Sequence, residues 1–136
     1  MNKFAYLAPT ILRIGISLVF LWFGYSQVSD QVQWVLYVPE SIVNLSKINA
    51  ETLVLLNGIF EIVFGTALLL GFWTRTAALL LALHMFEIVY IVGFDATGVR
   101  DFGIAVAAVA VFLHGKDGFT LDALIAQKDS DGQVSA

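Results

Sequence analysis

The sequence predicts an all-α membrane protein, a bundle of four transmembrane helices with a long interfacial loop between helices 1 and 2. The chain is 59% hydrophobic and only 13% charged, about half the charged share of soluble domains. Four apolar runs approach the roughly 20 residues that a helix needs to cross a bilayer. Lipid cannot satisfy backbone polar groups, so these runs are expected to be helical. They cover residues 8–28, 52–72, 76–94 and 98–114.

The connections between the four runs differ in length. Residues 73–75 join the second run to the third, and residues 95–98 join the third to the fourth, so both pairs are expected to be antiparallel hairpins. The loop at residues 29–51 is much longer and carries Trp34 and Tyr37. Trp and Tyr favour the membrane interface. We therefore expect this loop to lie on the bilayer surface or to cap the bundle.

Length and composition limit the possible functions. The 136 residues suffice for one domain, expected at residues 1–124, followed by a disordered polar tail at residues 125–136. The net charge of −4 argues against a nucleic-acid partner, which would need a basic face. The chain has no Cys, which excludes disulfides, thiolate metal sites and dithiol chemistry within it.

Basic residues near the helix ends predict the orientation. With four spans both termini lie on one side of the membrane, and that side holds Lys3, Arg75, Lys116 and Lys128. The opposite side holds Lys47 and Arg100. Because cytoplasmic loops carry the excess of Lys and Arg, both termini are expected in the cytoplasm and the long loop outside.

Two carboxylates, Glu61 and Glu87, lie inside apolar runs. A charge at mid-membrane depth costs roughly 2.5–3.5 kcal/mol on insertion scales, and such residues are usually partnered and functional. From the rise per residue, Glu61 lies roughly 14 Å and Glu87 roughly 10 Å below the outer edge, so they approach one level. His84 shares a helix face with Glu87, and Asn57 shares one with Glu61.

Three more polar residues extend this cluster. Arg100 and Gln27 lie at the outer ends of the fourth and first runs, and with the previous four residues they predict an outward-facing pocket for ligand binding or proton relay. Arg13 lies in the cytoplasmic third of the first run. Its side chain either reaches the inner interface or points into the bundle towards Thr66 or Glu61.

Other interpretations of the same residues stay open. Glu61 and Glu87 can instead pair with arginines and fix the helix register. His84 with these two carboxylates forms a weak candidate for a Zn, Fe or Mn site, although no ligand-spacing motif accompanies it. Asp101 can simply favour a helix N-terminus. Small residues along the runs allow close helix contact and would also suit a homodimer.

Several segments, taken in order, carry a family resemblance: residues 12–15, 20–24, 57–65, 70–78 and 115–122. Residues 57–65 include a Gly-x-x-Glu-x-x-x-Gly pattern, with Glu61 as its carboxylate. Together the segments resemble the DoxX family of small four-helix integral membrane proteins. The resemblance implies a bundle in the cytoplasmic membrane of a prokaryote, and the motif match carries over Arg13 and Glu61.

The resemblance also implies a redox function. Some relatives are membrane subunits of sulfur-linked, quinone-reducing oxidoreductases, and others accompany redox maturation systems. We therefore expect a subunit or accessory of a quinone-linked system, with a soluble or membrane redox partner. Many relatives have His before the first-helix Gly and Lys three residues after it, where this chain has Phe23 and Gln27. Proton-coupled transport of a small solute by an oligomer, and a scaffold or assembly role without chemistry, are the alternatives.

Overall fold

The computed structural model describes residues 4–134, with side chains described to residue 130. Four long helices make up the body of the molecule: α1 (Ala8–Ser29), α4 (Ala50–Leu70), α5 (Thr74–Val92) and α6 (Ala96–His114). Each is long and apolar enough to cross a membrane. The predicted four-helix membrane bundle is thus confirmed. Lys3 and residues 135–136, which entered the predicted orientation and tail, lie outside the described residues.

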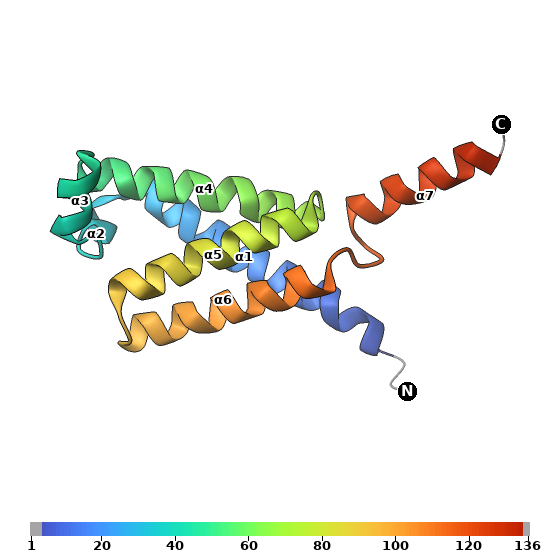
Figure 1. Ribbon diagram of the computed structural model, residues 1–136, viewed down its shortest axis with the longest axis horizontal. Helices are drawn as coiled ribbons and strands as arrows, with labels where there is room; N and C mark the ends of the chain where they lie inside the picture. The colour runs from blue at the N-terminus through green and yellow to red at the C-terminus, as the bar shows by residue number, and fades with distance from the viewer. Residues whose placement is uncertain (1–3, 135–136) are drawn as a thin grey trace.

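The four helices pack in a closed ring (Figure 1). α1 packs on α4 and α5 on α6, while the α4–α5 and α1–α6 contacts complete the ring. The end with residues 30–49 and the α5–α6 turn is called the loop end below. The opposite end, with the α4–α5 turn and residues 115–120, is called the terminal end. Phe20, Leu68 and Leu81 are fully buried and fill the bundle between the two ends.

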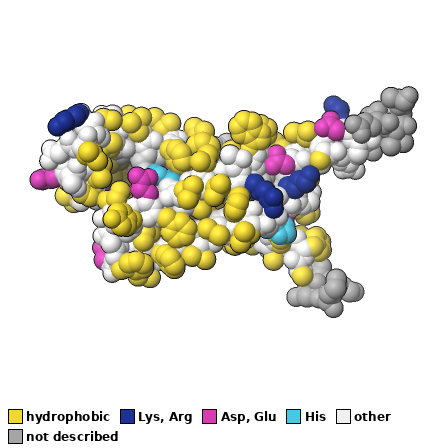
Figure 2. All heavy atoms as spheres, viewed as in Figure 1, with side chains coloured by type: hydrophobic (Ala, Val, Ile, Leu, Met, Phe, Trp, Pro, Cys, Tyr) yellow, Lys and Arg dark blue, Asp and Glu magenta, His cyan; other side chains and the backbone are white. Residues whose placement is uncertain are grey.

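The face of the bundle seen in Figure 2 is largely apolar. Leu18, Val63 and Leu83 each expose more than half of their surface, on three different helices. Large apolar side chains can cover such a surface stably when lipid rather than water surrounds it. The outward faces therefore agree with a protein that lives in a bilayer.

Local capping determines where the helices begin and end. The Asn49 side chain accepts a hydrogen bond of 2.8 Å from the Thr52 N–H and starts α4. Gly71, at φ +70°, ends α4 in a left-handed conformation that glycine adopts without strain. The α4–α5 turn consequently occupies residues 71–73 rather than 73–75. α4 and α5 each end two residues earlier than the sequence pattern predicted.

Two glycines bring α1 and α4 into backbone contact. A Cβ atom added at Gly24 would lie 2.7 Å from the Gly58 carbonyl oxygen, and one added at Gly58 would lie 2.9 Å from the Gly24 carbonyl oxygen. Small residues are the usual means of such close approach between membrane helices. This contact lies one turn from Gln27 and from Glu61, so it sets how closely their side chains approach.

The long loop folds into two short helices, α2 (Val32–Val35) and α3 (Glu40–Ser46), at the loop end (Figure 1). α2 packs against α4. The Trp34 Nε1 group donates a 3.1 Å hydrogen bond to Ser26 Oγ, which ties α2 to the end of α1. Of the two expected arrangements, the loop adopts the one in which it caps the bundle.

The polar tail differs from the expected disorder, because residues Leu121–Val134 form helix α7. Thr120 Oγ1 accepts a 3.2 Å hydrogen bond from the Ala123 N–H and so caps its first turn. The Asp122 carboxylate accepts hydrogen bonds of 3.0 and 2.8 Å from the Trp73 and Thr74 N–H groups. These bonds fix the start of α7 on the α4–α5 turn. The expectation of disorder is therefore corrected for residues 125–134.

Candidate functional site

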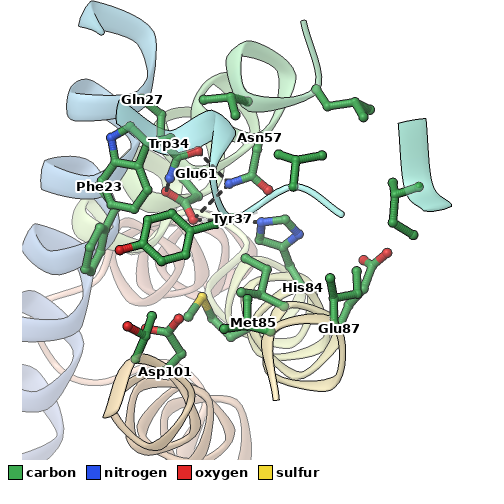
Figure 3. Close-up of a pocket in the computed structure, with 18 of the residues that line it drawn as sticks. Phe23, Gln27, Trp34, Tyr37, Asn57, Glu61, His84, Met85, Glu87 and Asp101 are labelled. Atoms are coloured by element: carbon green, nitrogen blue, oxygen red, sulfur yellow. Dashed lines mark hydrogen bonds and ion pairs between the residues drawn. The ribbon is translucent and has the colours of Figure 1, made fainter. Parts of the chain in front are cut away.

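A pocket with a volume of about 240 Å³ lies at the loop end, between the four long helices and the α2–α3 segment (Figure 3). Six of the seven predicted site residues line it: Gln27, Asn57, Glu61, His84, Glu87 and Arg100. They come from α1, α4, α5 and α6. Arg13, the seventh, lies at the terminal end. The six residues therefore line one pocket, although they are spread over 74 positions of the chain, from 27 to 100.

Glu61 lies at the centre of the polar cluster and is only 2% exposed. Its Oε2 accepts a 3.0 Å hydrogen bond from Gln27 Nε2, and its Oε1 lies 3.4 Å from Asn57 Nδ2. Asn57 Nδ2 also donates a 2.6 Å bond to Gln27 Oε1. The three side chains thus form a closed set of hydrogen bonds across the α1–α4 contact. The amide donors of Gln27 on α1 and Asn57 on α4 offset the free-energy cost of burying this carboxyl group.

His84 faces the same carboxyl group from α5 (Figure 3). Its Nε2 lies 3.8 Å from Glu61 Oε1, too far for a hydrogen bond. This nitrogen is buried and has no hydrogen-bond partner among the described residues. Its ring packs on Phe60 with centroids 4.7 Å apart, which holds its orientation. A buried polar atom without a partner costs free energy, so a ligand atom or a water molecule that forms a hydrogen bond with it in the pocket is bound favourably.

Glu87 does not join Glu61 and His84. Its side chain is exposed, and Figure 3 shows its carboxylate directed away from the other two. Three residues turn a helix by about 300°, so Glu87 lies about 60° around α5 from His84. The weak metal candidate formed by His84, Glu87 and Glu61 is therefore not assembled, and no group of three potential ligands is arranged for a metal within the described part of the chain.

Arg100 and Asp101 form the α6 wall of the pocket. Arg100 Nε donates a 2.8 Å hydrogen bond to Asp101 Oδ1, and the guanidinium carbon lies 4.8 Å from the Phe23 ring centroid. Asp101 is 4% exposed, whereas the Arg100 side chain is 47% exposed. From the sequence alone, Asp101 fits a residue that favours a helix N-terminus. In the structure Asp101 is buried beside Arg100 and lines the pocket. The two opposite charges at adjacent positions of the sequence already indicated such a pair.

Aromatic side chains complete the pocket. Phe23, Trp34 and Tyr37 line it, with edge contact between Phe23 and Trp34 at a centroid distance of 5.7 Å. Trp34 and Tyr37 come from the capping loop, and the sequence predicted either the bilayer surface or a cap for this loop without predicting that its rings line a pocket. Phe23 and Gln27, the two positions where the family resemblance implied His and Lys, both line the pocket.

Arg13 has a different environment at the terminal end. It is 1% exposed, and its Nε donates a 2.7 Å hydrogen bond to Asp117 Oδ2. Nη1 donates to the carbonyl oxygens of Leu68 and Leu69, and Nη2 donates to Asp117 Oδ1 and to the Phe119 carbonyl oxygen. The side chain neither reaches the interface nor approaches Thr66 or Glu61. Five acceptors match the five N–H donors of a guanidinium.

Asp117 is the partner that sequence reasoning missed. Burial alone would raise the pKa of the Asp117 carboxyl, but hydrogen bonds from Arg13 and the Phe119 N–H, with the charge of Arg13, hold it below its ordinary value. The carboxyl therefore stays ionised at neutral pH and pairs with Arg13. This pair is structural, because it joins α1 to the segment after α6 and leaves no polar atom for a ligand.

The DoxX family model matches residues 8–93, more than half of the chain. The chain belongs to the DoxX family. It is thus an integral membrane DoxX protein with four membrane helices. The matched residues run from α1 through α5 and include Gln27, Asn57, Glu61 and His84. No curated protein and no solved structure matches the chain.

Proposed function

We propose that this DoxX protein binds a lipophilic molecule of the quinone class in the loop-end pocket and is a membrane subunit or accessory of a quinone-linked redox system. One observation carries the proposal. The buried carboxyl group of Glu61 and the partnerless Nε2 of His84 lie 3.8 Å apart and face the same pocket. A buried acid beside an imidazole is a pair of groups that exchanges protons with a bound molecule.

The pocket suits a single substituted ring. Its volume of about 240 Å³ lies just below the roughly 300–1,000 Å³ of sites for drug-sized ligands. Phe23, Trp34 and Tyr37 offer aromatic faces against which a flat ring can stack. An imidazole N–H of His84 can donate to a carbonyl oxygen of the ring. Exposed Glu87 and Tyr37 lie at the rim, where a lipophilic tail would leave the pocket.

A quinone, when bound, supplies a couple that takes up two electrons and two protons. This chain's residues would hold and move the protons: Glu61 and His84 at the ring, and Glu87 at the pocket rim. The electrons must come from a partner protein, since the chain has no Cys to form a dithiol couple. We therefore propose that this chain is a subunit that binds the quinone rather than a complete oxidoreductase.

The closed floor of the pocket favours binding over transport. The deepest residues of the pocket lining on α4, α5 and α6 are Glu61, His84 and Asp101. Below them the fully buried Phe20, Leu68 and Leu81 fill the bundle. A transported solute would have to displace this core and then pass the Arg13–Asp117 pair.

The distribution of basic residues supports an orientation with the pocket towards the outer face. Arg75, Lys116 and Lys128 belong to the terminal end, whereas Lys47 and Arg100 belong to the loop end. By the preference of Lys and Arg for the cytoplasmic side, the proposal includes cytoplasmic termini in the cytoplasmic membrane of a prokaryote. A redox partner at the pocket would then approach from the outer side.

Fluorescence quenching by a quinone tests the proposal. Trp22→Phe with Trp73→Phe leaves Trp34, which lines the pocket, as the single tryptophan. The purified protein in detergent is titrated with a short-chain naphthoquinone, and saturable quenching of Trp34 is expected. Adding Glu61→Gln should weaken the apparent affinity about tenfold, equal to 1.4 kcal/mol. Glu51→Gln changes an exposed carboxylate of the same helix and should leave the affinity unchanged.

Three results would overturn the proposal. The first is quenching that does not saturate. The second is an equal affinity in the Glu61→Gln and Glu51→Gln variants. The third is tight binding of a lipophilic cation of similar size in place of the quinone, which would make the carboxylates a cation site. A protein that binds neither molecule, but loses stability on Glu61→Gln, would instead support the scaffold alternative.

A further inference from the structure

A second groove, separate from the pocket, lies at the terminal end, where α5 begins and α6 ends. Three basic side chains line it, Arg75, His114 and Lys116, together with the rings of Phe72 and Trp73. All five side chains are exposed. Figure 2 shows Lys, Arg and His side chains gathered in this region, with an acidic side chain beside them, on a largely apolar face. We call these five residues the basic groove.

The two cations of the basic groove, Arg75 and Lys116, are not neutralised by ion pairs within the described residues, and backbone contacts hold Arg75 in place. Arg75 Nη2 lies 3.4 Å from the Leu113 carbonyl oxygen, and the Arg75 side chain crosses Gly115, where an added Cβ would lie 2.8 Å from its Nε. Arg75 and Lys116 form no ion pair within 4.0 Å in the described part of the chain. Two positive charges are therefore available to a ligand.

Two acidic residues also border the groove; the charge of Lys116 helps to lower the pKa of Asp122, but neither acid forms an ion pair with Arg75 or Lys116 among the described residues. The Asp122 carboxylate accepts hydrogen bonds from the Trp73 and Thr74 N–H groups and from Thr74 Oγ1, so it is committed to the N-terminus of α5. Asp129 lies seven residues further along α7, about 10 Å away along the helix. An anion can therefore bind between Arg75 and Lys116.

The level of the groove matches that of lipid head groups. α5 starts at Thr74 and α6 stops at His114, so the groove lies where two membrane spans end. The Phe72 and Trp73 rings stack with centroids 5.2 Å apart and remain exposed, as is usual for aromatic residues at the membrane interface. Basic pockets between membrane helices at this level are suited to anionic lipid head groups.

We propose that the basic groove binds the phosphodiester group of an anionic phospholipid. Arg75 and Lys116 contact the phosphate oxygens from two sides, His114 adds a third donor, and the stacked rings lie against the start of the acyl chains. The site is independent of the quinone proposal, because no residue of the basic groove lines the loop-end pocket.

Native mass spectrometry tests this site. The full chain in detergent is mixed with equal amounts of phosphatidylglycerol and phosphatidylcholine, and adducts with phosphatidylglycerol are expected to dominate. Arg75→Gln with Lys116→Gln should lower these adducts about tenfold or more, since each basic residue contributes substantially to anionic-lipid binding. The matched control is Lys47→Gln with Lys128→Gln, which removes the same charge outside the groove and should leave the adducts unchanged.

Three results would overturn the site. An equal loss in the control pair would mean that net charge alone attracts the lipid. Displacement of phosphatidylglycerol by millimolar glycerol phosphate would mean that the groove recognises free phosphate rather than a lipid. The Lys116 side chain has no hydrogen bond among the described residues, so Lys116→Gln alone should fold normally even if the double variant does not. Undiminished lipid adducts in this single variant would exclude a contact between Lys116 and the phosphate.

Discussion

Arg13 and Asp117 lie 104 positions apart in the chain, and 2.7 Å separates Arg13 Nε from Asp117 Oδ2. This pair closes the terminal end of the bundle, with every guanidinium donor matched by an acceptor. The loop end has the opposite character, because His84 Nε2 is buried beside Glu61 without a hydrogen-bond partner. The two polar regions of the bundle thus separate into one that holds the fold and one that can receive a ligand.

Asp117→Asn should destabilise the fold strongly. It leaves the buried Arg13 charge without its counter-ion, and breaking a buried pair in this way costs about 3–5 kcal/mol. Unfolding in detergent followed by circular dichroism measures the loss. Asp30→Asn, an exposed carboxylate beyond the end of α1, is the control and should change stability by less than about 0.5 kcal/mol. Equal stability of the two variants would show that the pair contributes nothing.

Acid should weaken the terminal end before it affects the core. The pKa values of Asp117 and Asp122 are both held below their ordinary value in the folded protein. Their contribution to stability is therefore fully present above the unfolded pKa of roughly 3.9 and is lost as the pH falls through the lower folded values. Melting temperatures from neutral pH down to about pH 3 should decline most steeply below about pH 4. Asp117→Asn should flatten this decline, and an unchanged slope would contradict the assignment.

Gly24→Ala should separate α1 from α4. The added Cβ meets the Gly58 carbonyl oxygen at 2.7 Å, so backbone rather than a flexible side chain must move. Overpacking of this kind costs about 1–3 kcal/mol. Gly15→Ala in the same helix is the control, since nothing lies within 4 Å of its added Cβ. Thermal unfolding should therefore distinguish the two variants, with Gly15→Ala neutral or slightly stabilising.

Single-cysteine labelling should show the loop end outside the cell. The chain has no Cys, so Asn44→Cys in α3 and Ser130→Cys in α7 each provide one exposed thiol. A membrane-impermeant maleimide should label the first variant in intact cells and the second only after lysis. Labelling of Ser130→Cys alone in intact cells would reverse the proposed orientation.

Much of the pocket could be predicted from one sequence. The lengths of the apolar runs predict antiparallel helices, and depth along them brings Glu61 and Glu87 towards one level, where both line the pocket. The 3.6-residue period then predicts that Asn57 and Glu61 share a face. Helix length, depth in the bilayer and shared helix faces depend only on nearby residues and on the fixed thickness of the bilayer, so a single sequence predicts them.

The remaining features depend on segments outside regular helices. Asp117 lies in the non-helical chain after α6, so no helical period predicts that it folds back onto Arg13. Trp34 and Tyr37 could lie either on the bilayer surface or in a loop that caps the bundle. The packing of α2 on α4 places them in the cap. Helix α7 was missed because its polar composition suggests disorder, while its first turn is fixed by Thr120 and Asp122.

Crystallography of the protein in a lipid phase with a brominated naphthoquinone tests the central claim most directly. The account predicts one anomalous bromine peak within the loop-end pocket, with ring oxygens within hydrogen-bond distance of His84 Nε2 and the Glu61 carboxyl group. A peak confined to the lipid-facing surface would contradict it. So would a closed pocket in which His84 and Glu61 bond only to each other.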